Sequence, residues 1–109
     1  MTGMLYLVEV DVELAHCETW IAWMQAHHLP DVMATECFQR CQWGEVIEDR
    51  TSTHRRFKMV YTLMDQNAMQ TYQDVHAATL QRDHQDRFAT VTRARRDLIP
   101  LFGCLTNGA

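Results

Sequence analysis

Histidines and aromatic residues recur at helical spacing in two segments of this chain. The first segment, residues 20–30, reads Trp-x-x-Trp-Met-x-x-His-His-Leu-Pro. The second, residues 72–88, places a tyrosine, a histidine, a leucine and a second histidine four residues apart. Imidazole can donate or accept a proton near neutral pH, and aromatic rings can form the walls of a small-molecule pocket. The two segments are therefore predicted to line a site for acid–base chemistry on a small molecule.

Roles can be assigned to these residues by type. The candidate catalytic residues are His76, His27 and His28, and the candidate ligand-binding residues are Trp20, Trp23, Tyr72, His84 and Arg87. His27 and His28 point about 100° apart on a helix, so only one of them can face the pocket. If the helices run antiparallel, the end of the first lies near the start of the second. We therefore expect Trp23 and one of these two histidines to lie beside Tyr72 and His76.

The same pattern also has a purely structural interpretation. Tryptophan and tyrosine at helical spacing are more often packed between helices, and a histidine on an apolar stripe is more often a hydrogen-bonded core residue. Three hypotheses stay open: an enzyme, a non-catalytic binding protein with the same pocket, and a structural dimer whose histidines are packed.

Metal chemistry is disfavoured by the spacing of the histidines. His76 and His84 lie roughly 12 Å apart along a helix and about 80° apart around it, so they cannot ligate one metal. Neither segment has two ligands at the spacing that places them on one helix face. We expect no metal and no cofactor, with a haem ligated by a single histidine as the minor alternative.

Length and charge limit the classes of function. A chain of 109 residues with a net charge of −4 is expected to form one domain, residues 1–109, without a basic surface for nucleic acid. Its longest apolar run, residues 4–8, is too short to cross a bilayer, and the N-terminus does not resemble a signal peptide. We therefore expect a cytoplasmic protein that binds neither nucleic acid nor membranes.

The hydrophobic pattern predicts six elements around the two segments. They are a strand at 4–12, a helix at 13–28, a strand at 38–49, a strand at 54–64, a helix following Asp65, and a strand at 88–98. Pro30 should end the first helix or open a short new turn, Gly44 suggests a bulge, and Asp65 can cap the second helix. The apolar residues after 98 should pack on their own domain or on a partner.

The order β-α-β-β-α-β gives a ferredoxin-like α+β sandwich, with four antiparallel strands and both helices on one face. The opposite face of the first strand is half apolar and half charged, with Leu5 and Leu7 followed by Glu9 and Asp11. Arg93 and Arg95 of the last strand could pair with these two carboxylates. A second sheet would cover such a face, so we expect a homodimer packed sheet against sheet.

The motifs at 20–32 and 72–88, with the strand order, resemble the dimeric α+β-barrel superfamily, and within it a small bacterial family known only as a domain of unknown function. The resemblance implies the fold and the dimer, but not an activity. One departure is Glu36, which stands where that family commonly has a glycine.

Members of the wider superfamily include cofactor-free monooxygenases of antibiotic biosynthesis, muconolactone isomerases, haem-degrading enzymes and stress-response proteins. The leading expectation is a small-molecule-binding barrel that acts as a cofactor-independent monooxygenase, cyclase or isomerase on an aromatic or polyketide-like metabolite. The alternatives are a non-catalytic accessory or ligand-binding protein of a biosynthetic pathway, and the structural dimer.

Overall fold

The central strand has one face in the core because its side chains alternate. In the computed structural model, which describes residues 3–108, β1 (Met4–Glu13) alternates between buried and half-buried residues along its whole length. It pairs antiparallel with β3 (His54–Leu63) on one side and with β4 (Thr92–Pro100) on the other. β2 (Arg40–Glu45) pairs with β3, so the sheet order is β2-β3-β1-β4.

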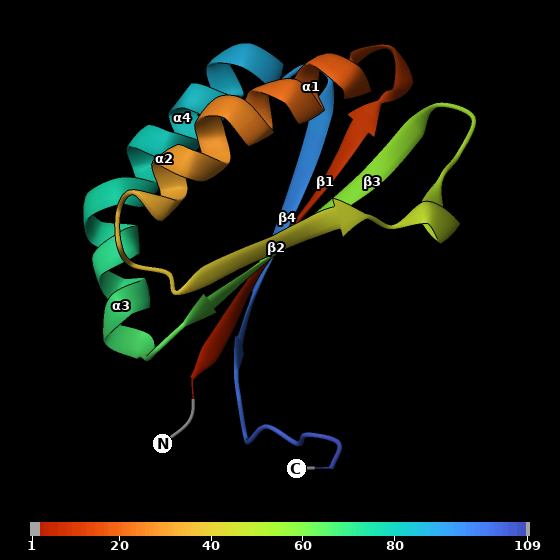
Figure 1. Ribbon diagram of the computed structural model, residues 1–109. Helices are drawn as coiled ribbons and strands as arrows, with labels where there is room; N and C mark the ends of the chain where they lie inside the picture. Colours follow the sequence, from red (N-terminus) through yellow and green to blue (C-terminus); the bar gives the residue numbers. More distant parts are fainter. Residues whose placement is uncertain (1–2, 109) are drawn as a thin grey trace.

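Two helical rods cover one face of this sheet (Figure 1). The first consists of α1 (Cys17–Trp23), a π-helical turn (Met24–His28) and α2 (Leu29–Met33). The second consists of α3 (Gln66–Thr71), a π-helical turn (Tyr72–His76) and α4 (Ala77–Phe88). Short 3₁₀ turns at Leu14–His16 and Ile47–Asp49 complete the chain. The predicted ferredoxin-like βαββαβ fold is confirmed.

The first rod continues through Pro30 to Met33, so of the two expected alternatives Pro30 opens a further turn and does not end the helix. In the π turn before it, the N–H of Leu29 donates to the carbonyl of Met24, five residues earlier. A proline has no N–H, and in a regular helix its ring clashes with the carbonyl four residues earlier. A π turn widens the backbone at that point, which gives the ring room and lets the helix continue.

The second rod begins as expected, because the Asp65 carboxylate accepts a hydrogen bond from the N–H of Ala68 at 3.0 Å. It ends later than expected. Phe88 belongs to α4 and packs on Trp23, with ring centroids 5.3 Å apart. The fourth strand therefore begins at Thr92 and not at residue 88.

The second strand is shorter than predicted and carries no bulge at Gly44. Trp43, Gly44 and Glu45 face three consecutive residues of β3, so the ladder is regular there. Gly44 lies on the side of the sheet away from the helices, where nothing packs on it.

The connection from α2 to β2 turns at Glu36, whose φ is 62°. Among the described residues it is the only non-glycine with a positive φ. An L-residue in this left-handed region costs roughly 1 to 2 kcal/mol relative to the right-handed one. Glycine has no Cβ and would adopt this backbone conformation without that cost.

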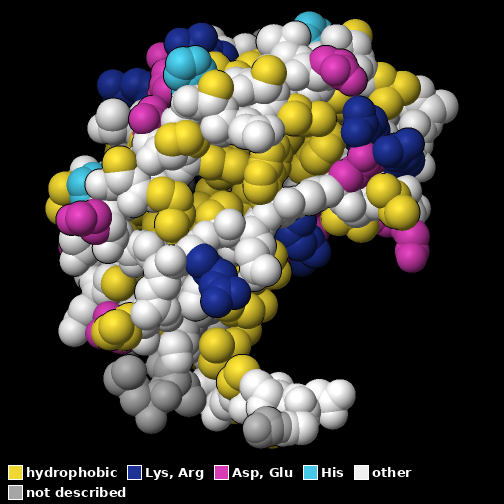
Figure 2. Space-filling view, in the orientation of Figure 1, with side chains coloured by type: hydrophobic (Ala, Val, Ile, Leu, Met, Phe, Trp, Pro, Cys, Tyr) yellow, Lys and Arg dark blue, Asp and Glu magenta, His cyan; other side chains and the backbone are white. Residues whose placement is uncertain are grey.

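The core lies between the rods and the sheet. Its largest fully buried side chains are those of Trp20, Met24, Met59 and Leu63. Figure 2 shows a hollow with hydrophobic side chains between the first rod and β2, where the helices cover the sheet less completely. No helix within residues 3–108 combines the length and apolarity that a bilayer crossing would need.

Two apolar surfaces of the single chain stay uncovered. On the face opposite the helices, Leu5, Leu7 and Val60 are only half-buried, and Ile99 is exposed. Beyond β4 the chain leaves the sheet as an arm (Figure 1), and Phe102 and Leu105 are 105% and 99% exposed. The arm therefore does not pack on its own domain.

Candidate functional site

A buried hydrogen bond joins the two rods. The indole Nε1 of Trp20 donates to Nε2 of His84 at 2.9 Å, and both side chains are buried. An indole N–H can only donate, so Nε2 of His84 accepts and its Nδ1 carries the proton of the neutral ring. Burial, together with the nearby His28 and Arg96, lowers the pKa of His84 to about 4. His84 is therefore neutral at physiological pH, in a single tautomer.

A second imidazole lies beside the first. His28 belongs to the π turn Met24–His28, stacks on Trp23 with ring centroids 5.3 Å apart, and lies 5.9 Å from the His84 ring. Its Nδ1 is buried and has no hydrogen-bond partner within the described residues. Burial also lowers the pKa of His28. The neighbouring His27 is exposed, so His28 is the inward-facing member of the pair.

The two imidazoles border a small cavity of about 30 Å³ between α4 and the sheet. Its other polar residues are Gln81 and Arg96, and the rest of its wall is aliphatic. This volume is enough for a water molecule or for one polar group of a ligand.

A wider groove of about 230 Å³ adjoins the cavity, and both hollows share Gln81 and Arg96. The groove has aromatic walls from Tyr6 and Tyr72, and Leu98 of β4 lies at its edge. Burial raises the pKa of both phenols, so both keep their protons at neutral pH. Together the hollows form an aromatic groove that leads to a pair of neutral imidazoles.

The structure brings together four of the residues predicted for the site. They are Trp20, Trp23, His28 and His84: the rings of the last three contact one another, and the Trp20 ring contacts His84. The guanidinium of Arg87 lies over the Trp23 ring, 5.3 Å from its centroid.

The predicted corner of Trp23 and His28 with Tyr72 and His76 is not formed. Tyr72 packs on Tyr6 and Phe38 instead, and the His76 ring lies beside the Tyr72 ring, with centroids 6.5 Å apart. The reason is the extra length of the first rod. Because it continues to Met33, His28 lies near its middle and meets His84 instead of the start of the second rod.

Sequence reasoning missed Arg96 and Gln81. The signal that could have found Arg96 is strand register, because this residue lies opposite Val8 and shares its helix-facing side.

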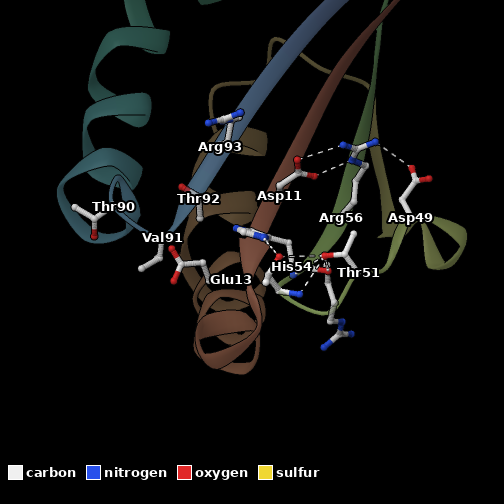
Figure 3. Close-up of a pocket in the computed structure, with 12 residues that line it drawn as sticks. Asp11, Glu13, Asp49, Thr51, His54, Arg56, Thr90, Val91, Thr92 and Arg93 are labelled. Atoms are coloured by element: carbon white, nitrogen blue, oxygen red, sulfur yellow. Dashed lines mark hydrogen bonds and ion pairs between the residues drawn. The ribbon is translucent and has the colours of Figure 1, made fainter.

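A further hollow of about 410 Å³ lies at the end of the sheet and contains an ion network (Figure 3). Arg56 donates to both carboxylate oxygens of Asp11, at 2.7 and 3.2 Å, and to Asp49 at 3.1 Å. It also lies 3.3 Å from Glu9. With its guanidinium already occupied by carboxylates, we assign this network to the stability of the sheet.

The network corrects the expected pairing of the sheet-face charges. Arg95 and Arg93 do lie opposite Glu9 and Asp11 in the ladder. The carboxylates are nevertheless bound from the other side by β3, and Figure 3 shows the Arg93 side chain directed away from Asp11.

Within residues 3–108, no three side chains of the metal-ligating types gather where they could hold an ion.

A family profile described as "Domain of unknown function (DUF4286)" matches residues 3–100. The chain belongs to the DUF4286 family. No curated protein matches it.

Solved structures similar to this DUF4286 protein share its fold at low sequence identity. A dimeric ferredoxin-like protein from an uncultured marine organism is 13% identical, with a TM-score of 0.65 over 99% of this chain and 95% of that one. A protein of unknown function from Nitrosomonas europaea is 14% identical, with a TM-score of 0.61 over 100% and 98%.

A monooxygenase from the gene ActVA-Orf6 of Streptomyces coelicolor, in complex with the ligand nanaomycin D, is 6% identical. Its TM-score is 0.68 over 98% of this chain and 94% of that one. At such identities the likeness shows a shared fold and nothing about activity.

Proposed function

We propose that this DUF4286 protein binds a small planar aromatic molecule in the groove between α4 and strands β1 and β4. One polar group of the ligand enters the cavity between His28 and His84. The observation that carries the proposal is the unpartnered, buried Nδ1 of His28 at a cavity of about 30 Å³ that adjoins an aromatic groove of about 230 Å³. A buried polar atom without a partner costs about 1 to 3 kcal/mol, which a ligand hydroxyl or carbonyl would recover.

The two imidazoles would play different roles toward such a group. A histidine with a pKa of about 4 is a weak base at neutral pH, so His84 acts as a hydrogen-bond donor through Nδ1–H. His28, whose Nδ1 is unpartnered, is the residue that can exchange a proton with the ligand. The candidate reaction is a cofactor-independent proton transfer or oxygenation assisted by His28, and the Streptomyces coelicolor neighbour is described as a monooxygenase.

A second candidate function is ligand binding without catalysis, as an accessory protein of a biosynthetic pathway. The low basicity of His84 favours it, because one of the two imidazoles at the cavity is a poor general base at neutral pH. His27 and His76 support neither candidate, since they line neither the cavity nor the groove.

We also propose that the functional unit is a homodimer packed through the helix-free face of the sheet. The half-buried Leu5, Leu7 and Val60 lie on this face, and a large apolar patch is uncommon on a monomer. The dimeric ferredoxin-like neighbour supports the same assembly.

The binding proposal can be tested by titrating the protein with 1-naphthol and following the histidine ring signals by NMR. We expect the signals of His28 and His84 to shift and those of the exposed His16 and His27 to stay unchanged. His28→Gln should weaken binding roughly tenfold through the lost hydrogen bond, and the matched control His27→Gln should not. Shifts confined to residues outside the groove would contradict the proposal and leave the histidines as packing residues.

A further inference from the structure

We propose that the groove selects planar aromatic ligands that carry a carboxylate, and that Arg96 is the residue that binds this group. The inference rests on the proposed binding function and adds the chemical class of the ligand.

Arg96 and its two neighbours in β4 lie on opposite faces of the sheet. Arg96 lies opposite Val8, on the helix-facing side of β4, while Arg95 and Asp97 alternate to the other side and lie 3.5 Å from each other. Among residues 3–108, no carboxylate lies within ion-pair distance of Arg96. An unneutralised guanidinium thus lines both the groove and the cavity.

The groups around Arg96 leave this charge without compensation. Tyr6 from β1 and Tyr72 from the second rod face it as protonated phenols, and His28 and His84 face it as neutral rings. Asp83 of α4 is paired with Arg87 on the helix surface, at 3.6 Å. Asp97, at the rim of the groove, is paired with Arg95 as described.

The chemistry of guanidinium points to a carboxylate. Its planar fork donates two parallel hydrogen bonds to a carboxylate, which a neutral amide cannot accept in the same way. The groove of about 230 Å³ lies below the roughly 300–1,000 Å³ of sites for drug-sized ligands, so it fits a body of one or two rings. The ring system would lie against Tyr6 and Tyr72, with the carboxylate on Arg96.

The test compares 1-naphthoate with 1-naphthamide, which share a ring system and differ in charge, by isothermal titration calorimetry at pH 7. We expect 1-naphthoate to bind at least about tenfold more tightly. Arg96→Gln should remove this difference, and Arg96→Lys should retain only part of it. Arg93→Gln is the matched control and should keep the wild-type preference, because Arg93 lies opposite Asp11 on the other face of the same strand and lines neither the groove nor the cavity. Both arginines are exposed, so neither change should affect folding, which circular dichroism would verify.

Gln81→Trp separates the two ways in which the idea can fail, since Gln81 lines both hollows and a bulky ring there would block them. If both probes bind the wild type and Arg96→Gln equally well but lose binding in Gln81→Trp, the groove is a binding site and the role of Arg96 is overturned. If neither probe binds, or if Gln81→Trp binds them as the wild type does, the proposed function fails together with the inference.

Discussion

His84 is a residue whose protonation is set almost entirely by its neighbours. The Trp20 indole occupies Nε2, which places the remaining proton on Nδ1, and burial removes the water that would stabilise a charged ring. The same contact therefore joins the two rods and prepares a neutral hydrogen-bond donor at the cavity.

This environment predicts a pH dependence of stability. The pKa of His84 falls from 6.5 to about 4 on folding, so below pH 6.5 the unfolded chain takes up a proton that the folded chain takes up only near pH 4. The contribution of His84 to the free energy of unfolding is therefore complete above pH 6.5 and is lost as the pH falls toward 4. From pH 7 to 4.5, the free energy of unfolding of the wild type should fall by about 2 to 3 kcal/mol more than that of His84→Gln.

Urea unfolding at several pH values measures this difference. Glutamine can still accept from the Trp20 indole but does not titrate, and the other ionisable groups contribute equally to both proteins. Parallel stability curves for the two proteins would show that His84 titrates normally in the folded state.

At this scale the sequence predicted which residue types form the cluster but not all of its members. Helical spacing named Trp20, Trp23 and His84 as candidate residues, but Trp23 was expected beside His76, and the structure places it against His84. The sequence could not show whether His27 or His28 faces inward, because that depends on a π turn that changes the phase of the helix. Arg96 was missed because its orientation depends on pairing with a strand distant in sequence.

At the scale of elements, the periodicity of buried residues predicted the type and order of every strand and main helix. The boundaries were less predictable. Pro30 is a helix-ending signal in isolation, and only the wide turn before it makes it compatible with a continuous rod. The predicted start of β4 depended on whether Phe88 belongs to that strand or to the apolar face of α4. Its packing on Trp23 places it on α4.

The loop before β2 offers a test of backbone strain at Glu36. Replacing Glu36, at φ 62°, with glycine relieves the left-handed strain but increases the entropy of the unfolded chain. The net expectation is a gain of about 0.5 to 1 kcal/mol in the free energy of unfolding, measured with urea.

The matched control is Glu18→Gly, the same replacement at an exposed position of α1, which should lower stability by about 1 kcal/mol. A loss of stability in Glu36→Gly would mean that the Glu36 side chain contributes more than its backbone strain costs.

At the scale of the whole molecule, the helix-free face of the sheet is the surface through which we propose that two copies of the chain associate. Leu7 lies near its centre, between Val60 of β3 and Asp97 of β4. Leu7→Lys would place a charge in the proposed interface while remaining compatible with Asp97 in a monomer. We expect the wild type to elute as a dimer and Leu7→Lys as a folded monomer, in size-exclusion chromatography with light scattering.

Leu14→Lys, the same replacement at an exposed turn outside the sheet face, should leave the dimer intact. A wild-type monomer, or a Leu7→Lys protein that remains dimeric, would contradict the proposed assembly. The exposed Phe102 and Leu105 of the C-terminal arm would then need another explanation.

The two π turns give the rods a property that composition alone does not carry. Each turn holds one residue more than regular α-helical pitch would, so the residues before and after it belong to different sectors of a helical wheel, displaced by about 100°. Deleting one residue from Met24–His28 would leave the identity of all other residues unchanged. It would nevertheless rotate α2 relative to α1 and return Pro30 to a regular helical turn. In this family the number of residues between motifs should therefore be under stronger selection than the identity of many residues within them.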